Sequence, residues 1–235
     1  MGHGYCTLLS RGDDTSTFTR RDDRLGKNNT LVVHDHLLKS GPLNIAHPDF
    51  QYNIPMKTIT VFGGSLPKPG SQAYQEAQRL GNLLADAGFA VQSGGYIGTM
   101  EAVSRGASEA GGHVIGVTCD EIESWRPVSP NQWVKEQKRC STLRERLYRL
   151  IDECEAAIAL PGGIGTLAEV TLTWADLQIH PEKPRPLIVV GQGWEETLGT
   201  FKTELGEYIP AADQSRIIAV PDVESAAAVL SNLIP

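Results

Sequence analysis

From residue 57 onward the sequence alternates between short apolar runs and segments with helical spacing, and this alternation restricts the possible folds more than any other feature. The apolar runs predict strands, and the segments between them, with apolar residues every three or four positions, predict amphipathic helices. We expect strands at residues 57–62, 89–92, 114–117, 156–160, 186–190 and 216–220, and helices at 72–87, 99–110, 142–153, 167–179, 194–208 and 223–233. Strands that alternate with helices of this length imply right-handed crossovers. The predicted fold class is α/β, a Rossmann-like doubly wound parallel sheet with helices on both faces.

Residues 1–55 differ from the rest of the chain. Their lysines and arginines balance their aspartates, so the whole net charge of −7 belongs to residue 56 onward. They show no sustained helical or strand period and are rich in Thr, Ser, Asp, Asn and Gly, which is typical of weakly ordered segments. We therefore expect a poorly ordered N-terminal extension at 1–55 and one Rossmann-like domain at 56–235. The triplet His34-Asp35-His36 could bind a metal, but a flexible segment fixes no ligand geometry, so we expect no metal site.

The composition narrows the class of protein. The chain has 235 residues, of which 40% are hydrophobic and 21% charged, so it can bury an ordinary globular core. Its net charge of −7 disfavours a nucleic-acid-binding surface, which needs a basic patch, but is compatible with a phosphate-bearing small molecule. The four cysteines include no Cys-x-x-Cys pair, and no apolar run has the length of a membrane helix. We expect a cytoplasmic protein with a small-molecule partner, no nucleic-acid partner and no membrane contact.

Three glycine-rich loops follow predicted strands. In doubly wound sheets, ligands bind beyond the carboxyl ends of the strands, at the point where the strand order reverses. If the order is 3-2-1-4-5, the loops after the first, second and fourth strands meet at that point. These loops are residues 63–70, 94–98 and 161–166, the three most glycine-rich loops of the chain. The coincidence predicts a nucleotide or another phosphate-bearing ligand between them.

The second and third of these loops have matching sequences. The run Gly94-Gly95-Tyr96-Ile97-Gly98-Thr99-Met100-Glu101 resembles Gly162-Gly163-Ile164-Gly165-Thr166-Leu167-Ala168-Glu169. Glycine lets the backbone approach a ligand closely, a helix start offers free N–H groups to an anion, and each threonine could cap its helix or donate to a phosphate. Either loop alone could be no more than a tight turn with a capping box, but two matching loops at one point favour binding. The expected substrate- or phosphate-binding residues are Gly64, Ser65, Gly94, Gly95, Gly98, Thr99, Gly162, Gly163, Gly165 and Thr166.

Each matching run ends with a glutamate in what we expect to be the first helical turn. A carboxylate at this position often completes a cap. Beside a phosphate site it would repel the ligand, unless it acts on a neighbouring group such as a ribose hydroxyl or a developing oxocarbenium ion. We therefore interpret Glu169 as functional, whereas capping explains Glu101 at least as well.

The run Pro161-Gly162-Gly163-Ile164-Gly165-Thr166-Leu167-Ala168-Glu169 resembles the Pro-Gly-Gly-x-Gly-Thr-x-x-Glu signature of the LOG (Lonely guy) family, often mislabelled as lysine decarboxylases. The resemblance includes Trp174-Ala175-Asp176-Leu177-Gln178-Ile179-His180, Lys183-Pro184 and Val61-Phe62-Gly63-Gly64-Ser65, and it covers residues 56–235. Members of this family are typically homodimeric phosphoribohydrolases. They cleave the N-glycosidic bond of a cytokinin riboside 5′-monophosphate, or in some members of AMP, to free base and ribose 5-phosphate. The resemblance implies a catalytic pair of Glu169 and Arg146, a homodimer and no cofactor.

Three positions depart from the family pattern. The usual Arg-Lys pair reads Arg146-Leu147, the usual Gly-Gly-Gly-x-x-Gly-Leu-Met-Gly run is altered at residues 93–101, and no methionine-bearing turn precedes the arginine at residues 140–143. A non-catalytic nucleotide or molybdenum-cofactor carrier, of which similar proteins are known, therefore stays open as the alternative. The leading hypothesis is a nucleoside-monophosphate glycosidase, because Glu169 and Arg146 are both retained.

Two other activities are disfavoured. An NAD-dependent oxidoreductase would need Gly-x-Gly-x-x-Gly in the first loop and an acidic residue after the second strand, where Gln92 and Ser93 stand. Lysine decarboxylation would need a lysine bound to pyridoxal phosphate, and the three loops contain only Lys68. Trp125 and Trp133, in the irregular stretch before Arg146, are expected to pack or to contact a second subunit, although either could stack on a base.

Overall fold

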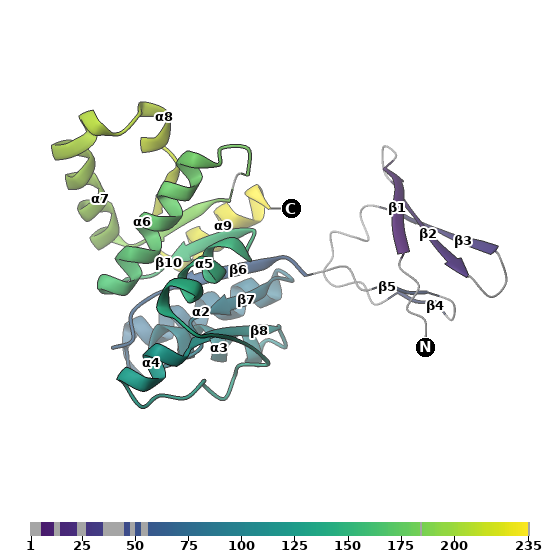
Figure 1. The fold of residues 1–235 in the computed structure, drawn as a ribbon, viewed down its shortest axis with the longest axis horizontal. Coiled ribbons are helices and arrows are strands. Elements are labelled where there is room, and N and C mark those ends of the chain that lie inside the picture. The colour runs from purple at the N-terminus through teal and green to yellow at the C-terminus, as the bar shows by residue number, and fades with distance from the viewer. Residues whose placement is uncertain are drawn as a thin grey trace. The chain divides into compact units, whose positions relative to one another are not determined.

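The computed structural model describes the backbone of residues 6–11, 15–22, 27–34, 45–47 and 50–52, and the backbone and side chains of residues 56–183 and 185–234. The chain divides into two compact units, Met1–Met56 and Lys57–Pro235. Figure 1 shows the helices and strands of both.

The first unit contains short antiparallel strands that the sequence did not predict. β1 (Cys6–Arg11), β2 (Thr15–Asp22) and β3 (Lys27–His34) form one sheet in the order β1-β2-β3, and β4 (Ile45–His47) pairs with β5 (Phe50–Tyr52). The expectation of a poorly ordered extension stays a prediction. The side chains of His34-Asp35-His36 lie outside the described residues.

The second unit is built on a seven-stranded sheet with the order β12-β11-β10-β6-β7-β8-β9. All neighbouring strands in this sheet are parallel, which confirms the predicted fold class. The order reverses between β6 and β10, as the sequence analysis assumed. The strands are β6 (Thr58–Phe62), β7 (Ala90–Ser93), β8 (Val114–Cys119), β9 (Glu136–Cys140), β10 (Ala156–Ala159), β11 (Leu187–Val190) and β12 (Ile217–Val220).

Helices cover both faces of this sheet. The helices are α2 (Gln72–Asp86), α3 (Thr99–Glu109), α4 (Asp120–Trp125), α5 (Leu143–Asp152), α6 (Ile164–Ile179), α7 (Gln192–Leu205), α8 (Ala211–Gln214), α9 (Val223–Leu233) and the 3-10 turn η1 (Gly206–Tyr208). In Figure 1, α5 and α6 lie in front of the sheet, and α2 and α3 lie behind it. Within residues 56–183 and 185–234, none of these helices has the length and apolar character that a membrane crossing requires.

The alternation of side chains along each strand divides the hydrophobic core into two layers. On β10, Ile158 packs into a cluster with residues of α2, α3 and α9, whereas Ala157 and Ala159 pack into a second cluster with residues of α5, α6 and α7. All residues of β10 are buried, as expected for a central parallel strand. The sheet is therefore held from both sides, and its carboxyl edge stays open for loops.

Two elements of this unit had no apolar signal in the sequence. β9 has the sequence EQKRC at the edge of the sheet, where solvent reaches most of its side chains, so it lacks the apolar run that marked the other strands. α4 has one turn and a half and contains no buried residue. Both lie in the stretch that the sequence analysis described as irregular.

The start of α6 corrects the predicted loop after β10. The helix begins at Ile164 rather than at residue 167, with Gly163 as its N-cap residue, so the glycine at position 165 is helical. The loop is therefore limited to residues 161–163, and Glu169 lies in the second turn of α6 instead of the first. A capping role for this glutamate is excluded by its position.

Close packing between α2 and α3 depends on two helical glycines. A Cβ at Gly81 would lie 2.2 Å from the carbonyl oxygen of Val103, and a Cβ at Gly106 would lie 1.9 Å from that of Gln78. In contrast, a Cβ at Gly199 in α7 would meet no atom within 4 Å. The first two glycines allow two backbones to approach, and the third has no such role.

We expect Gly106→Ala to lower the free energy of unfolding by about 1–3 kcal/mol, because the added methyl group overlaps a backbone carbonyl. Gly199→Ala should raise it by about 0.5–1 kcal/mol, since alanine favours an unobstructed helix. Urea unfolding of both variants measures the difference. Stabilisation by both substitutions would contradict the close packing of α2 and α3.

Candidate active site

A cavity of about 590 Å³ opens at the carboxyl edge of the sheet, next to the point where the strand order reverses. It is bordered by the loop after β6, the loop before α3, the end of α4, one side chain of α5 and the start of α6. Its lining residues are Gly63, Gly64, Ser65, Leu66, Pro67, Tyr96, Met100, Ile122, Trp125, Arg126, Arg146, Pro161, Gly162, Gly163, Ile164, Gly165, Thr166 and Glu169.

Direct backbone contacts hold the three glycine-rich loops together. The N–H of Gly64 donates to the carbonyl of Pro161 at 3.3 Å, and the N–H of Thr99 donates to the carbonyl of Gly64 at 2.9 Å. Gly98 has a φ of +73°, and a Cβ at this position would lie 2.7 Å from the carbonyl oxygen of Gly64. Only glycine combines this backbone conformation with this close approach. The loop after β6 is therefore held between the other two.

Glu169 places a carboxyl group at the cavity from the second turn of α6. The residue is 8% exposed. Burial raises the pKa of its carboxyl group to about 7, and the positive charge of Arg146 opposes that rise. Near neutral pH, both the ionised and the protonated form are therefore populated.

Arg146 extends from α5 to the same place and is also buried, with 6% exposed. Thr142 caps this helix by accepting from the N–H of Glu145 at 3.1 Å. The Nε of Arg146 donates to the carbonyl of Val117 at 2.8 Å, and its Nη1 lies 3.9 Å from Oε1 of Glu169. The guanidinium is fixed by the sheet on one side and faces the carboxyl group on the other.

Gly94 leaves the space that this guanidinium occupies. A Cβ at position 94 would lie 1.8 Å from Nη2 of Arg146 and 2.5 Å from Sδ of Met100. The ring of Tyr96 lies beneath the same guanidinium, with its centroid 5.8 Å from Cζ. The loop at residues 94–98, predicted to bind a ligand, therefore makes room for the side chain of Arg146.

The structure brings together most of the predicted site residues. Those that line the cavity are Gly64, Ser65, Gly162, Gly163, Gly165, Thr166, Arg146 and Glu169. Gly94, Gly95, Gly98 and Thr99 do not line it. For these four, contact with a ligand stays a prediction, and the contacts that the structure shows are with the protein itself.

The structure contradicts the alternative in which Thr99, Thr166 or Glu101 caps its helix. Neither α3 nor α6 has a side-chain cap, because Gly98 and Gly163 occupy the N-cap positions. Glu101 instead accepts a hydrogen bond from the hydroxyl of Tyr74 at 3.3 Å. Thr166 lies 2.2 Å from where a Cβ of Gly162 would be, so its hydroxyl packs against the loop.

Sequence reasoning missed one wall of the cavity. Ile122, Trp125 and Arg126 reach it from α4 and from the residue that follows this helix. Stacking by Trp125 was one of its considered roles, but nothing marked Arg126, since a lone arginine in an aperiodic stretch carries no signal. The missed wall adds a second arginine to the lining.

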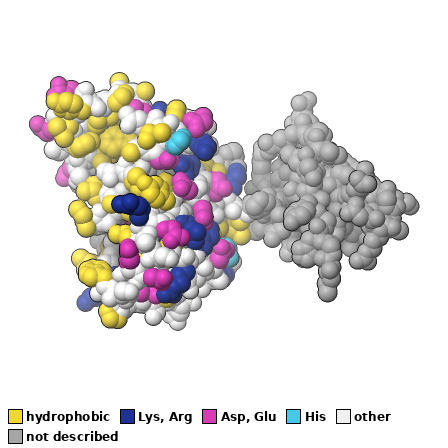
Figure 2. All heavy atoms as spheres, viewed as in Figure 1, with side chains coloured by type: hydrophobic (Ala, Val, Ile, Leu, Met, Phe, Trp, Pro, Cys, Tyr) yellow, Lys and Arg dark blue, Asp and Glu magenta, His cyan; other side chains and the backbone are white. Residues whose placement is uncertain are grey.

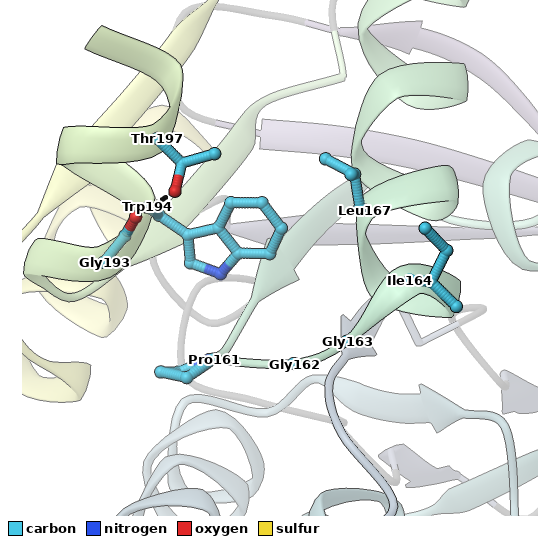
Figure 3. A pocket seen from close by; sticks show the side chains of 8 residues that line it. All are labelled: Pro161, Gly162, Gly163, Ile164, Leu167, Gly193, Trp194 and Thr197. Carbon is cyan, nitrogen blue, oxygen red and sulfur yellow. Dashed lines mark hydrogen bonds between the residues drawn. The ribbon is translucent and has the colours of Figure 1, made fainter. Parts of the chain in front are cut away.

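A second cavity lies on the other side of the loop after β10 (Figure 3). It has a volume of about 370 Å³ and is lined mainly by apolar groups, with the indole of Trp194 between α7 and the loop. The Nε1 of Trp194 donates to the carbonyl of Leu160 at 3.1 Å and so anchors the start of the loop. The backbone of residues 161–163 is consequently exposed between two cavities.

The lining of the cavity can accommodate an anionic ligand at the start of α6. A Cβ at Gly163 or Gly165 would meet nothing within 4 Å, so the start of α6 offers backbone to a ligand without obstruction. No lysine is among the described lining residues, so none can form a Schiff base there. Residues 56–183 and 185–234 contain no cluster of three side chains suited to bind a metal.

The buried carboxyl group gives the stability of the protein a specific pH dependence. The pKa of Glu169 is higher in the folded than in the unfolded state, so its contribution favours folding below about pH 4.5 and is lost as the pH rises through about 7. Between these limits, wild type should lose on the order of 3 kcal/mol relative to Glu169→Gln, whose amide stays neutral. Urea unfolding over this pH range measures the difference. The exposed control Glu204→Gln should follow wild type, and parallel curves for wild type and Glu169→Gln would contradict the burial of a titrating carboxyl group.

Comparison with known proteins places these residues in a family. A family model described as "Possible lysine decarboxylase" matches residues 100–230. A cytokinin riboside 5′-monophosphate phosphoribohydrolase from Rhodococcoides fascians is 30% identical over 180 residues, which cover 75% of this chain and 90% of that protein. The cytokinin riboside 5′-monophosphate phosphoribohydrolase LOG of Oryza sativa subsp. japonica is 37% identical over 166 residues, which cover 69% of this chain and 67% of that protein.

Solved structures support the same fold. The molybdenum cofactor binding protein from the phototrophic bacterium Rippkaea orientalis has a TM-score of 0.62 and 22% identity, over 78% of this chain and 100% of that chain. At this identity the likeness concerns the fold alone. The family model and the two phosphoribohydrolases carry the assignment, and they show that the chain belongs to the LOG family, described in its family model as possible lysine decarboxylases.

Proposed function

We propose that this protein hydrolyses the N-glycosidic bond of a nucleoside 5′-monophosphate and releases the free base and ribose 5-phosphate. The observation that carries the proposal is the pairing of two buried charged residues in one cavity, Glu169 and Arg146, 3.9 Å apart. The relatives named as cytokinin riboside 5′-monophosphate phosphoribohydrolases support the same reaction class. A cytokinin riboside monophosphate and AMP are the proposed substrates.

The start of α6 is the proposed phosphate site. Backbone N–H groups at a helix N-terminus bind anions, and the bare glycines at positions 163 and 165 leave them accessible from the cavity. Glu169 lies on the next turn of the same helix. A nucleotide bound by its phosphate would therefore present its ribose to the carboxyl group.

Glu169 is the proposed catalytic residue. As the bond between C1′ and the base nitrogen breaks, its electron pair leaves with the base and positive charge develops on the sugar. An ionised carboxylate in a buried site stabilises that charge and can accept a proton from the attacking water, whose oxygen bonds to C1′. The departing base gains a proton. The pKa of about 7 keeps a sufficient fraction of Glu169 ionised near neutral pH while the group can still return the proton.

Arg146 is the proposed partner of this carboxylate. Its Nε donates to the carbonyl of Val117, and the absence of a side chain at Gly94 leaves room for the guanidinium. The guanidinium therefore keeps its orientation when substrate enters. The charge of Arg146 favours the ionised form of Glu169, and the η nitrogens are the groups available for a ribose or phosphate oxygen.

Binding without turnover is the second candidate. The molybdenum cofactor binding protein of Rippkaea orientalis shares the fold, and a leucine at position 147 replaces the lysine expected beside Arg146. A carrier would use the same glycine-rich loops but would not need a buried, titrating carboxyl group. The presence of Glu169 therefore favours the enzyme.

Incubation of the purified protein with AMP and with isopentenyladenosine monophosphate, followed by chromatography for free base, tests the proposal. We expect wild type to release base, and Glu169→Gln to lose at least about 100-fold in rate, because an amide neither stabilises the cationic sugar nor accepts a proton. Circular dichroism should show that the variant is folded. Base release at the wild-type rate by folded Glu169→Gln would refute its role, and tight nucleotide binding without release by wild type would favour the carrier.

A homodimer is part of the proposal. The exposed face of α6 carries Ile164, Ala168, Thr171, Ala175 and Ile179, and its two isoleucines are 85% and 69% exposed. Figure 2 shows hydrophobic side chains gathered over α6 and α7. A helix that is apolar or small nearly all round is normally buried. A second copy of the chain would cover this face, as in the homodimers typical of the family.

Substitution Ala175→Arg should convert a dimer to a monomer, because it places a charge at the centre of this face. Gln75→Arg, at an exposed position of α2 on the other side of the sheet, is the control and should leave the dimer intact. Light scattering after size-exclusion chromatography gives the mass. A monomeric wild type, or a dimeric Ala175→Arg variant, would contradict the proposed interface.

The proposed location is the cytoplasm. Cys119, Cys140 and Cys154 are free and buried, which suits a reducing compartment. Since the net charge of −7 falls on residues 56–235, the proposed partner is a small phosphate-bearing molecule rather than a nucleic acid.

A further inference from the structure

One arginine of the cavity, Arg126, has neither a carboxylate partner nor an acceptor for its Nε among the described residues. Arg126 follows α4 and lines the cavity, and its Nε is buried without a hydrogen-bond acceptor among the described residues. No carboxylate in the described part of the chain lies within ion-pair distance of its guanidinium. A buried guanidinium N–H without an acceptor is costly, so it favours a ligand that supplies one.

The acidic residues nearest in sequence are engaged elsewhere. Asp120 and Glu123 of α4 both pair with Arg139 on β9, at 2.6 Å and 3.1 Å. Glu121 accepts a hydrogen bond from the N–H of Leu143 at 2.7 Å. Three carboxylates on one short helix thus leave the adjacent Arg126 unpaired, although any of them would be an ordinary partner for it.

The indole of Trp125 lies next to this guanidinium. The Cζ of Arg126 lies 5.6 Å from the centroid of the indole, within the range of a cation–π interaction. The backbone N–H of Arg126 also donates to the carbonyl of Ile122 at 2.9 Å. Trp125 is 79% exposed and lines the same cavity, so it is available to hold Arg126 and buries little of its own surface in the core.

The other two charged residues of the cavity face each other. Among the described lining residues, Glu169, Arg146 and Arg126 are the ones that carry charge. Arg146 donates to the carbonyl of Val117 and faces Glu169 at 3.9 Å. With Glu169 ionised, the described lining therefore has one uncompensated positive charge, which an anionic group of a ligand would compensate.

We propose that Arg126 binds the 5′-phosphate of the nucleotide, and that Trp125 is the residue that positions its guanidinium. This inference rests on the proposed function for the identity of the ligand. It adds a charged side chain from the end of α4 to the backbone N–H groups proposed to bind the phosphate at the start of α6. Arg146 is then available for the sugar and for Glu169.

Calorimetric binding of AMP and of adenosine tests the proposal in the Glu169→Gln background, where turnover does not interfere. We expect Arg126→Ala to weaken AMP binding about 10- to 100-fold, the usual cost of a lost charge-assisted hydrogen bond, and to change adenosine binding by less than about 2-fold. Arg126→Lys should restore part of the preference for AMP, because it keeps the charge but loses the planar fork. Trp125→Ala should lose part of the same preference, and Trp125→Phe should retain it.

Arg105→Ala is the matched control. Arg105 has the same kind of contact with a tryptophan, with Cζ 5.7 Å from the ring of Trp133, but neither residue lines the cavity. This variant should bind AMP as the parent does. A preference for AMP that survives in Arg126→Ala, or a parent that binds AMP and adenosine equally, would overturn the proposal. Base release by wild type is scored separately, so a failure of the proposed hydrolysis is distinguishable from a failure of this phosphate contact.

Discussion

The position of Arg146 depends on the absence of a side chain at residue 94. A Cβ there would lie 1.8 Å from Nη2 of Arg146, so any other residue would displace the guanidinium from its place beside Glu169. That guanidinium is the positive charge that opposes the effect of burial on Glu169. The glycines of this protein thus have two different uses. Gly163 and Gly165 leave the backbone at the start of α6 unobstructed, whereas Gly94 makes room for the side chain of Arg146.

The electrostatics of the cavity follow from an incomplete ion pair. At 3.9 Å, Nη1 of Arg146 is too far from Glu169 for a strong hydrogen bond, and the Nε of the same guanidinium is committed to Val117. Burial therefore outweighs attraction, and the pKa of the carboxyl group rises to about 7. A closer ion pair would keep Glu169 ionised, so that it would not accept a proton near neutral pH. The observed spacing retains a group that can both carry charge and exchange a proton.

The helices and strands that could be predicted from the sequence are those whose buried side chains recur at a regular spacing. α9 was predicted with the bounds that it has, because it starts at a capping aspartate, Asp222, and keeps a regular apolar stripe. β9 was missed because an edge strand has few buried positions, and α6 was started too late because Gly165 resembles a loop residue although it is helical. Within the site, the glycine-rich run indicated Glu169, and the resemblance to the LOG family predicted that it pairs with Arg146; folding brings these residues, 23 positions apart, together. No pattern could indicate Arg126, since its proposed role rests on the absence of an acceptor for its Nε among the described residues.

The same fold occurs in a molybdenum cofactor binding protein at 22% identity, so the sheet and its loops do not by themselves decide between carrying a ligand and cleaving it. Whether such a protein carries its ligand or cleaves it depends on the side chains that reach the cavity. In this protein those side chains belong to two kinds of element. Glu169 belongs to a helix that packs on the sheet, and its burial raises the pKa of its carboxyl group. Arg126 belongs to the end of a short surface helix whose own carboxylates are bound by Arg139. Such an element can change its sequence without disturbing the core, so the proposed phosphate contact of Arg126 can diverge while the proposed catalytic residue Glu169 is retained.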